Sequence, residues 1–145
     1  MDRDRTDRRW LFGVLALGLG IGLAGAAGCG GGSPSLAPGR IVFFFNDTAT
    51  TEIYAMESDG TGIVNLIRRG SYEGEANGRR DGRKILFVSD RDGNEEVYSM
   101  NADGSGVVRL TDHPDEDTEP TWFPDGSRIV FESDRTGDGD QVWSM

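Results

Sequence analysis

The sequence predicts an all-β fold: an incomplete β-propeller of about two and a third four-stranded blades, after an N-terminal signal or helical segment. Three observations predict this class. A pattern recurs every 44 residues, short apolar runs are separated by turn signals, and many glycines directly follow Asp or Asn. Frequent turns between short apolar runs favour β-structure over helix.

The N-terminal part is expected to direct export. Four arginines within residues 3–9 precede an uncharged apolar run over residues 10–27, and this order predicts a secretory signal peptide over residues 1–28. Small residues followed by Cys29 resemble a bacterial lipobox, which implies lipidation of Cys29 as the new N-terminus. The alternative is an uncleaved transmembrane anchor, because the run nearly spans a bilayer. Residues 29–39 have the Gly, Ser and Pro composition of a flexible tether.

The repeat extends over residues 40–145, the predicted propeller segment, without gaps between the first two copies and with one inserted residue before Val142 in the third. Placing Ile41 against Ile85 sets the register, and a third copy begins at Ile129. The aligned pairs include Phe43 with Phe87, Tyr54 with Tyr98, Met56 with Met100, and Asp59-Gly60 with Asp103-Gly104. A period near this length with several strands per unit is typical of propeller blades, which bury one another's faces.

Four short strands are expected in the middle copy. Residues 85–88 are continuously apolar, which predicts a strand covered on both faces. Strand formers fill residues 96–100 and 107–110, and residues 120–123 supply the fourth strand. The turns between them use glycines that tolerate a positive φ, at Asp92-Gly93, Asp103-Gly104 and Pro124-Asp125-Gly126.

Three motifs in the last copy resemble the TolB-type propeller repeat. They are Pro120-x-Trp122-x-Pro124-Asp125-Gly126, Ile129-Val130-Phe131-x-Ser133-x-Arg135-x-Gly137 and Val142-Trp143-x-Met145. The resemblance covers roughly residues 40–145. It implies a non-catalytic, lipid-anchored lipoprotein of the bacterial cell envelope, facing the periplasm or exterior, that mediates protein–protein interaction with other envelope proteins. The alternative that it implies is the propeller portion of a truncated prolyl-oligopeptidase-like serine peptidase.

Two stretches depart from the repeat. The run from Phe44 to Thr51, continued through Tyr54, resembles the translation of a sequencing-library adapter joined to a genuine repeat. Natural drift is the alternative, and the codons from Asn46 onward distinguish the two. Residues 76–80 stand where residues 120–124 stand in the next copy, but they lack the tryptophan. We expect this blade edge to be the weakest ordered part of residues 40–145, since a large buried aromatic is missing.

No catalytic, cofactor-binding or metal-binding residue is predicted. Oxygen ligands alternate from Asp90 to Glu96 and from Asp134 to Asp140, as in calcium loops, but neither run completes that pattern, and turn chemistry explains both. His113 has no second histidine beside it, the only cysteine is the proposed anchor, and no Gly-x-Ser-x-Gly elbow is present. The formal net charge of -10 argues against nucleic-acid binding.

Arg91 and Arg135 occupy the same position of the repeat. We expect each to brace its turn through a hydrogen bond or salt bridge, and a charged rim for a partner is the alternative. Closed propellers have about 4–8 blades. Residues 40–145 are too few for such a ring, so we expect a fragment of a longer protein whose exposed apolar blade faces promote self-association.

Overall fold

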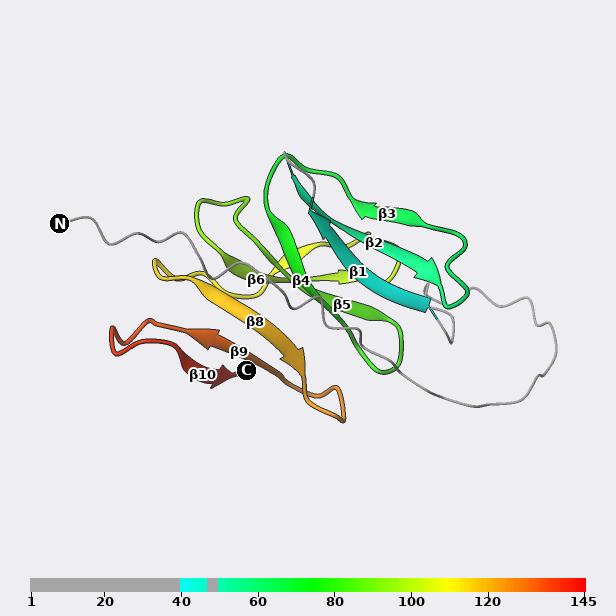
Figure 1. The fold of residues 1–145 in the computed structure, drawn as a ribbon. Coiled ribbons are helices and arrows are strands. Elements are labelled where there is room, and N and C mark those ends of the chain that lie inside the picture. Colours follow the sequence, from blue (N-terminus) through cyan, green and yellow to red (C-terminus); the bar gives the residue numbers. More distant parts are fainter. Residues whose placement is uncertain (1–39, 47–49) are drawn as a thin grey trace.

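The computed structural model describes residues 40–46 and 50–145, and these residues are all-β (Figure 1). Within this part of the chain no helix is long and apolar enough to cross a membrane. The predicted signal segment, the tether and Cys29 lie outside the described residues. The strands are β1 (Arg40–Asn46), β2 (Thr51–Glu57), β3 (Val64–Ile67), β4 (Glu73–Gly78), β5 (Lys84–Ser89), β6 (Glu96–Asn101), β7 (Val108–Arg109), β8 (Asp117–Trp122), β9 (Ile129–Ser133) and β10 (Gln141–Ser144).

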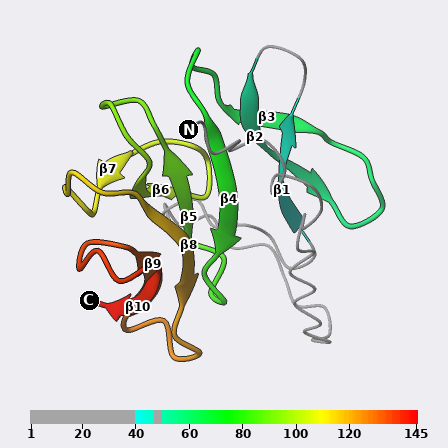
Figure 2. The ribbon, with the colours of Figure 1, turned by 60° about the vertical axis from the view of Figure 1, so that its left-hand side comes forward.

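The strands form three antiparallel sheets, which lie side by side as successive blades of an incomplete propeller (Figures 1 and 2). In the described residues the first blade has the order β1-β2-β3, the second β4-β5-β6-β7, and the third β10-β9-β8. The predicted all-β class is therefore confirmed, and the middle blade has the four strands predicted for each unit, whereas the first and third blades have three strands each among the described residues.

The grouping of the strands differs from the expectation in one respect. The predicted fourth strand of the middle copy is β8, and it pairs with β9 of the next blade rather than with β7. The register places Trp122 opposite Ile129 and Asp117 opposite Ser133. Likewise β4 opens the middle blade by pairing with β5. Each of these blades thus takes its first strand from the end of the preceding sequence repeat.

Strand β5 carries the middle of the core. Its residues Ile85, Leu86, Phe87 and Val88 are fully buried, as expected for a strand covered on both faces. Because side chains alternate along a strand, Ile85 and Phe87 pack toward the first blade and Leu86 packs toward the third. The two clusters are Ile53, Ile67, Ile85, Phe87, Tyr98 and Met100, and then Leu86, Val97, Ile129 and Phe131. Burial between blades therefore holds the sheets together.

The predicted turns form, and one of them closes the blade interface. Gly104 has φ +86°, a conformation that glycine adopts without strain. The carboxylate of Asp103 accepts hydrogen bonds from the amide and the hydroxyl of Ser105, at 2.9 and 2.6 Å. A Cβ atom on Gly104 would lie 2.3 Å from the carbonyl oxygen of Leu66 in the first blade. This glycine is therefore required for the close approach of two blades as well as for its φ.

Both departures from the repeat begin at the ends of strands. Residues 44–46 end β1, where Phe44 packs on the core and Phe45 is 57% exposed. Residues 76–78 end β4, and Ala76 packs against the first cluster. The relative weakness of this edge remains a prediction.

Candidate functional site

A buried acid braces the middle blade. Glu73, the first residue of β4, is fully buried, and its carboxylate accepts hydrogen bonds from the hydroxyls of Ser71 and Ser89 at 2.8 and 3.1 Å. The Arg91 guanidinium donates to the other oxygen at 2.6 Å. Arg91 also lies 4.7 Å from the ring centroid of Tyr98. We call this acid–serine–arginine arrangement the clasp.

The third blade repeats the clasp with a shorter acid. Asp117 is fully buried at the start of β8, and Arg135 donates to both of its carboxylate oxygens at 2.9 Å. Ser133 accepts from Arg135 Nε at 3.0 Å, and the guanidinium lies 4.7 Å from the ring centroid of Trp143. The two arginines thus brace the blades, as expected, although each partner is an acid 18 residues earlier in the chain. Sequence reasoning missed these acids, whose recurrence after 44 residues was the available signal.

The described part of the first blade lacks the parts of a clasp. Phe45 stands 44 residues before Ser89, and in the sequence Asp47 and Cys29 stand 44 residues before Arg91 and Glu73. Cys29 and Asp47 lie outside the described residues. Of these three positions, Phe45 and Asp47 fall in the run that resembles adapter-derived sequence, where the other two copies have a serine and an arginine.

A second buried acid organises the loop that contains His113. Glu96 is fully buried and accepts hydrogen bonds from Arg109 at 2.8 Å, from the Thr111 hydroxyl and from the backbone amide of His113 at 2.7 Å. The His113 ring lies beside Asp115, whose backbone amide donates to Nδ1 at 3.2 Å. His113 therefore helps to shape this loop.

The alternating oxygens of residues 90–96 do not converge on one point. Asp90 accepts from the Tyr72 amide at 2.8 Å, and Asn94 donates to the carbonyl of His113 at 2.8 Å. Asp92 accepts from the Tyr98 hydroxyl, and burial together with this hydrogen bond raises the pKa of Tyr98. Over residues 40–46 and 50–145, no group of three or more His, Cys, Asp or Glu side chains could hold a metal ion. The side chains of Asp90, Asp92 and Asn94 instead make separate hydrogen bonds that hold loops in place.

The first strands of the second and third blades share a strained bulge. Glu75 and Glu119 have φ values of 52° and 51°, which are uncommon for residues other than glycine, and the pairing register shifts at both sites. The Glu119 amide donates to the Glu75 carboxylate at 2.6 Å, which links β8 to β4. Burial, followed by the charges of Glu119 and Asp140, raises the pKa of Glu132. These bulges recur after 44 residues, and sequence reasoning did not find them.

Comparison with known proteins gives matches among solved structures only. Neither a family model nor a curated protein matches the sequence. The putative TolB from Agrobacterium tumefaciens is 26% identical with a TM-score of 0.67, and it is matched over 74% of this chain and 41% of its own. TolB from Acinetobacter baumannii is 27% identical with a TM-score of 0.64, over 77% of this chain and 29% of its own. The chain thus spans less than half the length of either structure.

More distant matches show the fold alone. The tricorn protease is 17% identical with a TM-score of 0.54, over 74% of this chain and 12% of its own. A chain of the nidogen/laminin complex is 13% identical with a TM-score of 0.55, over 72% of this chain and 43% of its own. The three sheets and these matches show that the described residues form an incomplete β-propeller, similar to those of the two TolB structures.

Proposed function

We propose that the chain is an exported, lipid-anchored protein of the bacterial cell envelope whose propeller binds other proteins and catalyses no reaction. The observation that carries the proposal is the use of its buried acids. Glu73, Glu96 and Asp117 each accept a hydrogen bond from an arginine, and Glu73 and Glu96 also accept from hydroxyls of the fold. Because these acids are occupied in holding the blades and a loop in place, the exposed loops remain as the surface that can contact a partner. The likeness to two TolB structures supports the same proposal.

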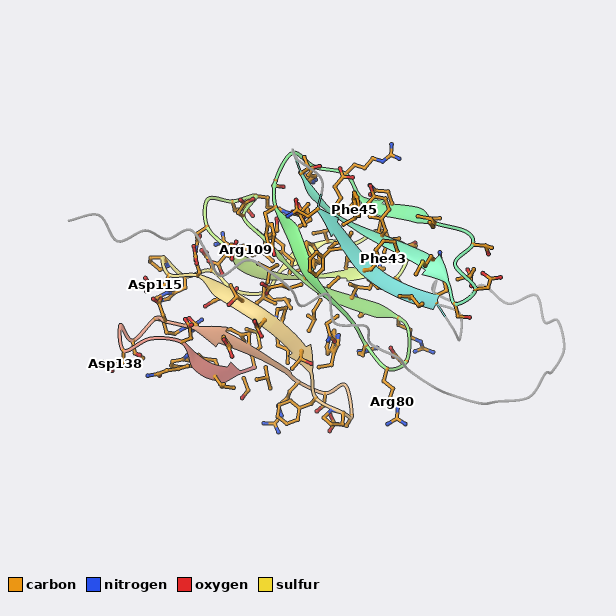
Figure 3. The ribbon with its side chains drawn as sticks, in the orientation of Figure 1. Phe43, Phe45, Arg80, Arg109, Asp115 and Asp138 are labelled. Atoms are coloured by element: carbon orange, nitrogen blue, oxygen red, sulfur yellow. The ribbon has the colours of Figure 1, made fainter. Side chains whose placement is uncertain are left out.

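The loops at one end of the blades give this scaffold a charged surface. The loops after β5 and β7 meet where Asn94 bonds the carbonyls of His113 and Asp115, and β8 starts there with a bond from the Asp117 amide to the Glu95 carbonyl. We call the exposed carboxylates of these loops and of the loop after β9 the acidic rim: Asp90, Asp92, Asp112, Asp115, Glu116, Asp134, Asp138 and Asp140. Figure 3 shows Asp115 and Asp138 on these loops, with Arg80 on the hairpin at the opposite end.

The acidic rim favours one class of partner. A concentrated negative surface repels phosphate backbones and attracts basic protein surfaces, and this attraction falls as salt rises. We therefore expect an envelope protein with a basic patch. A photo-crosslinking residue at Asp115 should capture that partner in cells, whereas the same residue at Arg80 should not. Equal capture from both positions would contradict the assignment of the rim.

The anchor is tested separately at Cys29. In bacteria grown with an alkyne fatty acid, the chain should take up the label and sediment with membranes. Cys29→Ser should abolish the label and release the protein, whereas Ser33→Ala, a matched change in the tether, should leave both unchanged. A labelled Cys29→Ser protein would refute lipidation at this residue. The peptidase alternative rests on a likeness of fold alone, and nothing in the described residues favours it.

A further inference from the structure

Basic side chains gather at the end of the blades opposite the acidic rim. Five cations, which we call the basic end, lie in or beside the β4–β5 and β8–β9 hairpins: Arg79, Arg80, Arg83, Lys84 and Arg128. The same hairpins hold Asp81 and Asp125, so positive side chains outnumber negative ones there by five to two. Figure 3 shows Arg80 on the first of these hairpins, at the opposite end from Asp115 and Asp138.

The two hairpins form one surface. The Arg79 guanidinium lies 5.5 Å from the ring centroid of Trp122, and a Cβ atom on Gly126 would lie 3.2 Å from Cδ of Arg79. The Arg128 guanidinium lies 4.2 Å from the ring centroid of Phe123. Cations stacked on aromatic rings present a charged head on an apolar body, and side chains of this character suit the interface between a bilayer and water.

Other acids at this end lie on the turns that follow β2 and β6. Asp59 and Asp103 each accept hydrogen bonds from the residue two places later, and Glu57 pairs with Arg40 at 3.2 Å. The excess of positive charge therefore lies on the two hairpins. Further blades would stack against the faces of the sheets, whereas these hairpins lie at the ends of strands, so blade stacking does not cover them.

The described chain starts at the basic end. Arg40 is the first residue of β1 and stands 44 residues before Lys84, the first residue of β5. The two strands occupy equivalent places in their blades, each pairing with the next strand in the same register. Figure 3 shows Phe43 and then Phe45 following one another along β1, away from the end where Arg80 lies. Arg40 stands 11 residues after Cys29, and a chain of that length reaches at most about 40 Å.

We propose that the basic end rests on anionic lipid headgroups of the membrane that holds the anchor, so that the acidic rim points away from the bilayer. The inference rests on the lipidation of Cys29 in the proposed function. Each arginine or lysine near an anionic surface shifts the contact equilibrium about fivefold. The same surface repels the carboxylates of the rim when they come within a Debye length of about 8 Å. Attraction at one end and repulsion at the other favour the same orientation.

Fluorescent probes at two matched prolines measure the orientation. Pro124 in the β8–β9 hairpin and Pro114 in the loop after β7 are both exposed, and each is replaced by a cysteine that carries the fluorophore. Acylation leaves Cys29 without a free thiol, so only the new cysteine is labelled. The acylated protein, isolated from bacterial membranes, is placed in vesicles of phosphatidylcholine and phosphatidylglycerol that carry a nitroxide quencher on some headgroups. The probe of Pro124→Cys should be quenched, and the probe of Pro114→Cys should not.

Two matched double variants test the need for charge. Arg80→Gln with Arg83→Gln removes two exposed charges from the basic end and should lower the contact equilibrium about 25-fold. Arg68→Gln with Arg69→Gln removes two exposed charges from the loop after β3, at the other end of the blades, and should change it little. Added salt, or vesicles of phosphatidylcholine alone, should relieve the quenching of the Pro124→Cys probe without any change of charge in the protein.

The outcomes separate this inference from the anchor on which it rests. Equal quenching of the two probes in an acylated protein would overturn the orientation and leave the anchor intact. A chain that takes up no alkyne fatty acid at Cys29 would refute the anchor and the orientation together. Quenching that persists without phosphatidylglycerol and in Arg80→Gln with Arg83→Gln would show that headgroup charge is not what the basic end binds. Capture of a protein from a photo-crosslinking residue at Arg80 would replace the lipid with a protein partner.

Discussion

Replacing Arg91 with methionine tests whether the clasp holds the blades together. The change keeps a side chain of similar length over the rings but leaves Glu73, which is fully buried, without its cation. Breaking a buried ion pair from one side costs about 3–5 kcal/mol. The two hydroxyl bonds from Ser71 and Ser89 remain, which places the expected loss at the lower end, about 3 kcal/mol. That is a large fraction of the roughly 5–15 kcal/mol that stabilises a domain.

Urea denaturation at one fixed protein concentration measures this loss as a change in the free energy of unfolding. The double variant Glu73→Gln with Arg91→Met should recover about half of it, because a neutral amide is cheaper to bury than an unpaired carboxylate. Arg80→Met is the matched control on an exposed residue, and it should change little. A loss below about 1 kcal/mol for Arg91→Met would mean that the pair behaves like an exposed one, and the reasoning would be wrong.

Three further predictions concern the blade interfaces and the turns. Gly104→Ala should destabilise the fold by well over the roughly 1–2 kcal/mol that its positive φ costs, because the new Cβ also meets the backbone of Leu66. Gly60→Ala, with φ +85° and nothing within 4 Å of its Cβ, should show only the cost of the positive φ. Equal losses for the two variants in urea unfolding would refute the close approach. Trp122→Phe should lower the free energy of unfolding by less than about 1 kcal/mol, because the buried indole N–H has no hydrogen-bond partner to lose, whereas Trp122→Ala should lower it by about 2–3 kcal/mol. Thermal melting of both variants measures this order, and a larger loss for Trp122→Phe would contradict the reasoning. Hydrogen bonds from the Ser105 hydroxyl and amide lower the pKa of Asp103 below its usual 3.8. The ionised carboxylate therefore stabilises the fold above pH 3.8, and this stabilisation is lost as the pH falls through the lowered pKa of the folded state. Ser105→Ala should raise the pKa of Asp103 in an NMR titration, and an unchanged pKa would contradict these hydrogen bonds.

The sequence by itself determined the local features of this protein. The period of 44 residues, the Asp-Gly turns and the apolar run of β5 depend on residues close together in the chain, so composition and spacing predict them. The burial of Ile85 to Val88 on both faces was predicted in the same way and is confirmed. The period also predicted a propeller, and the resemblance to the TolB-type repeat added the kind of propeller, which the solved structures support.

Only the tertiary structure decided which blade each strand joins. In the repeat, β8 can be read as the end of one unit or the start of the next, and only its hydrogen bonds to β9 distinguish the two. Arg91 reaches an acid 18 residues earlier, and the strained bulges at Glu75 and Glu119 depend on the same neighbouring strands. These partners are set by packing between segments that are distant in the chain, and a periodic sequence does not specify where in the repeat one sheet ends and the next begins.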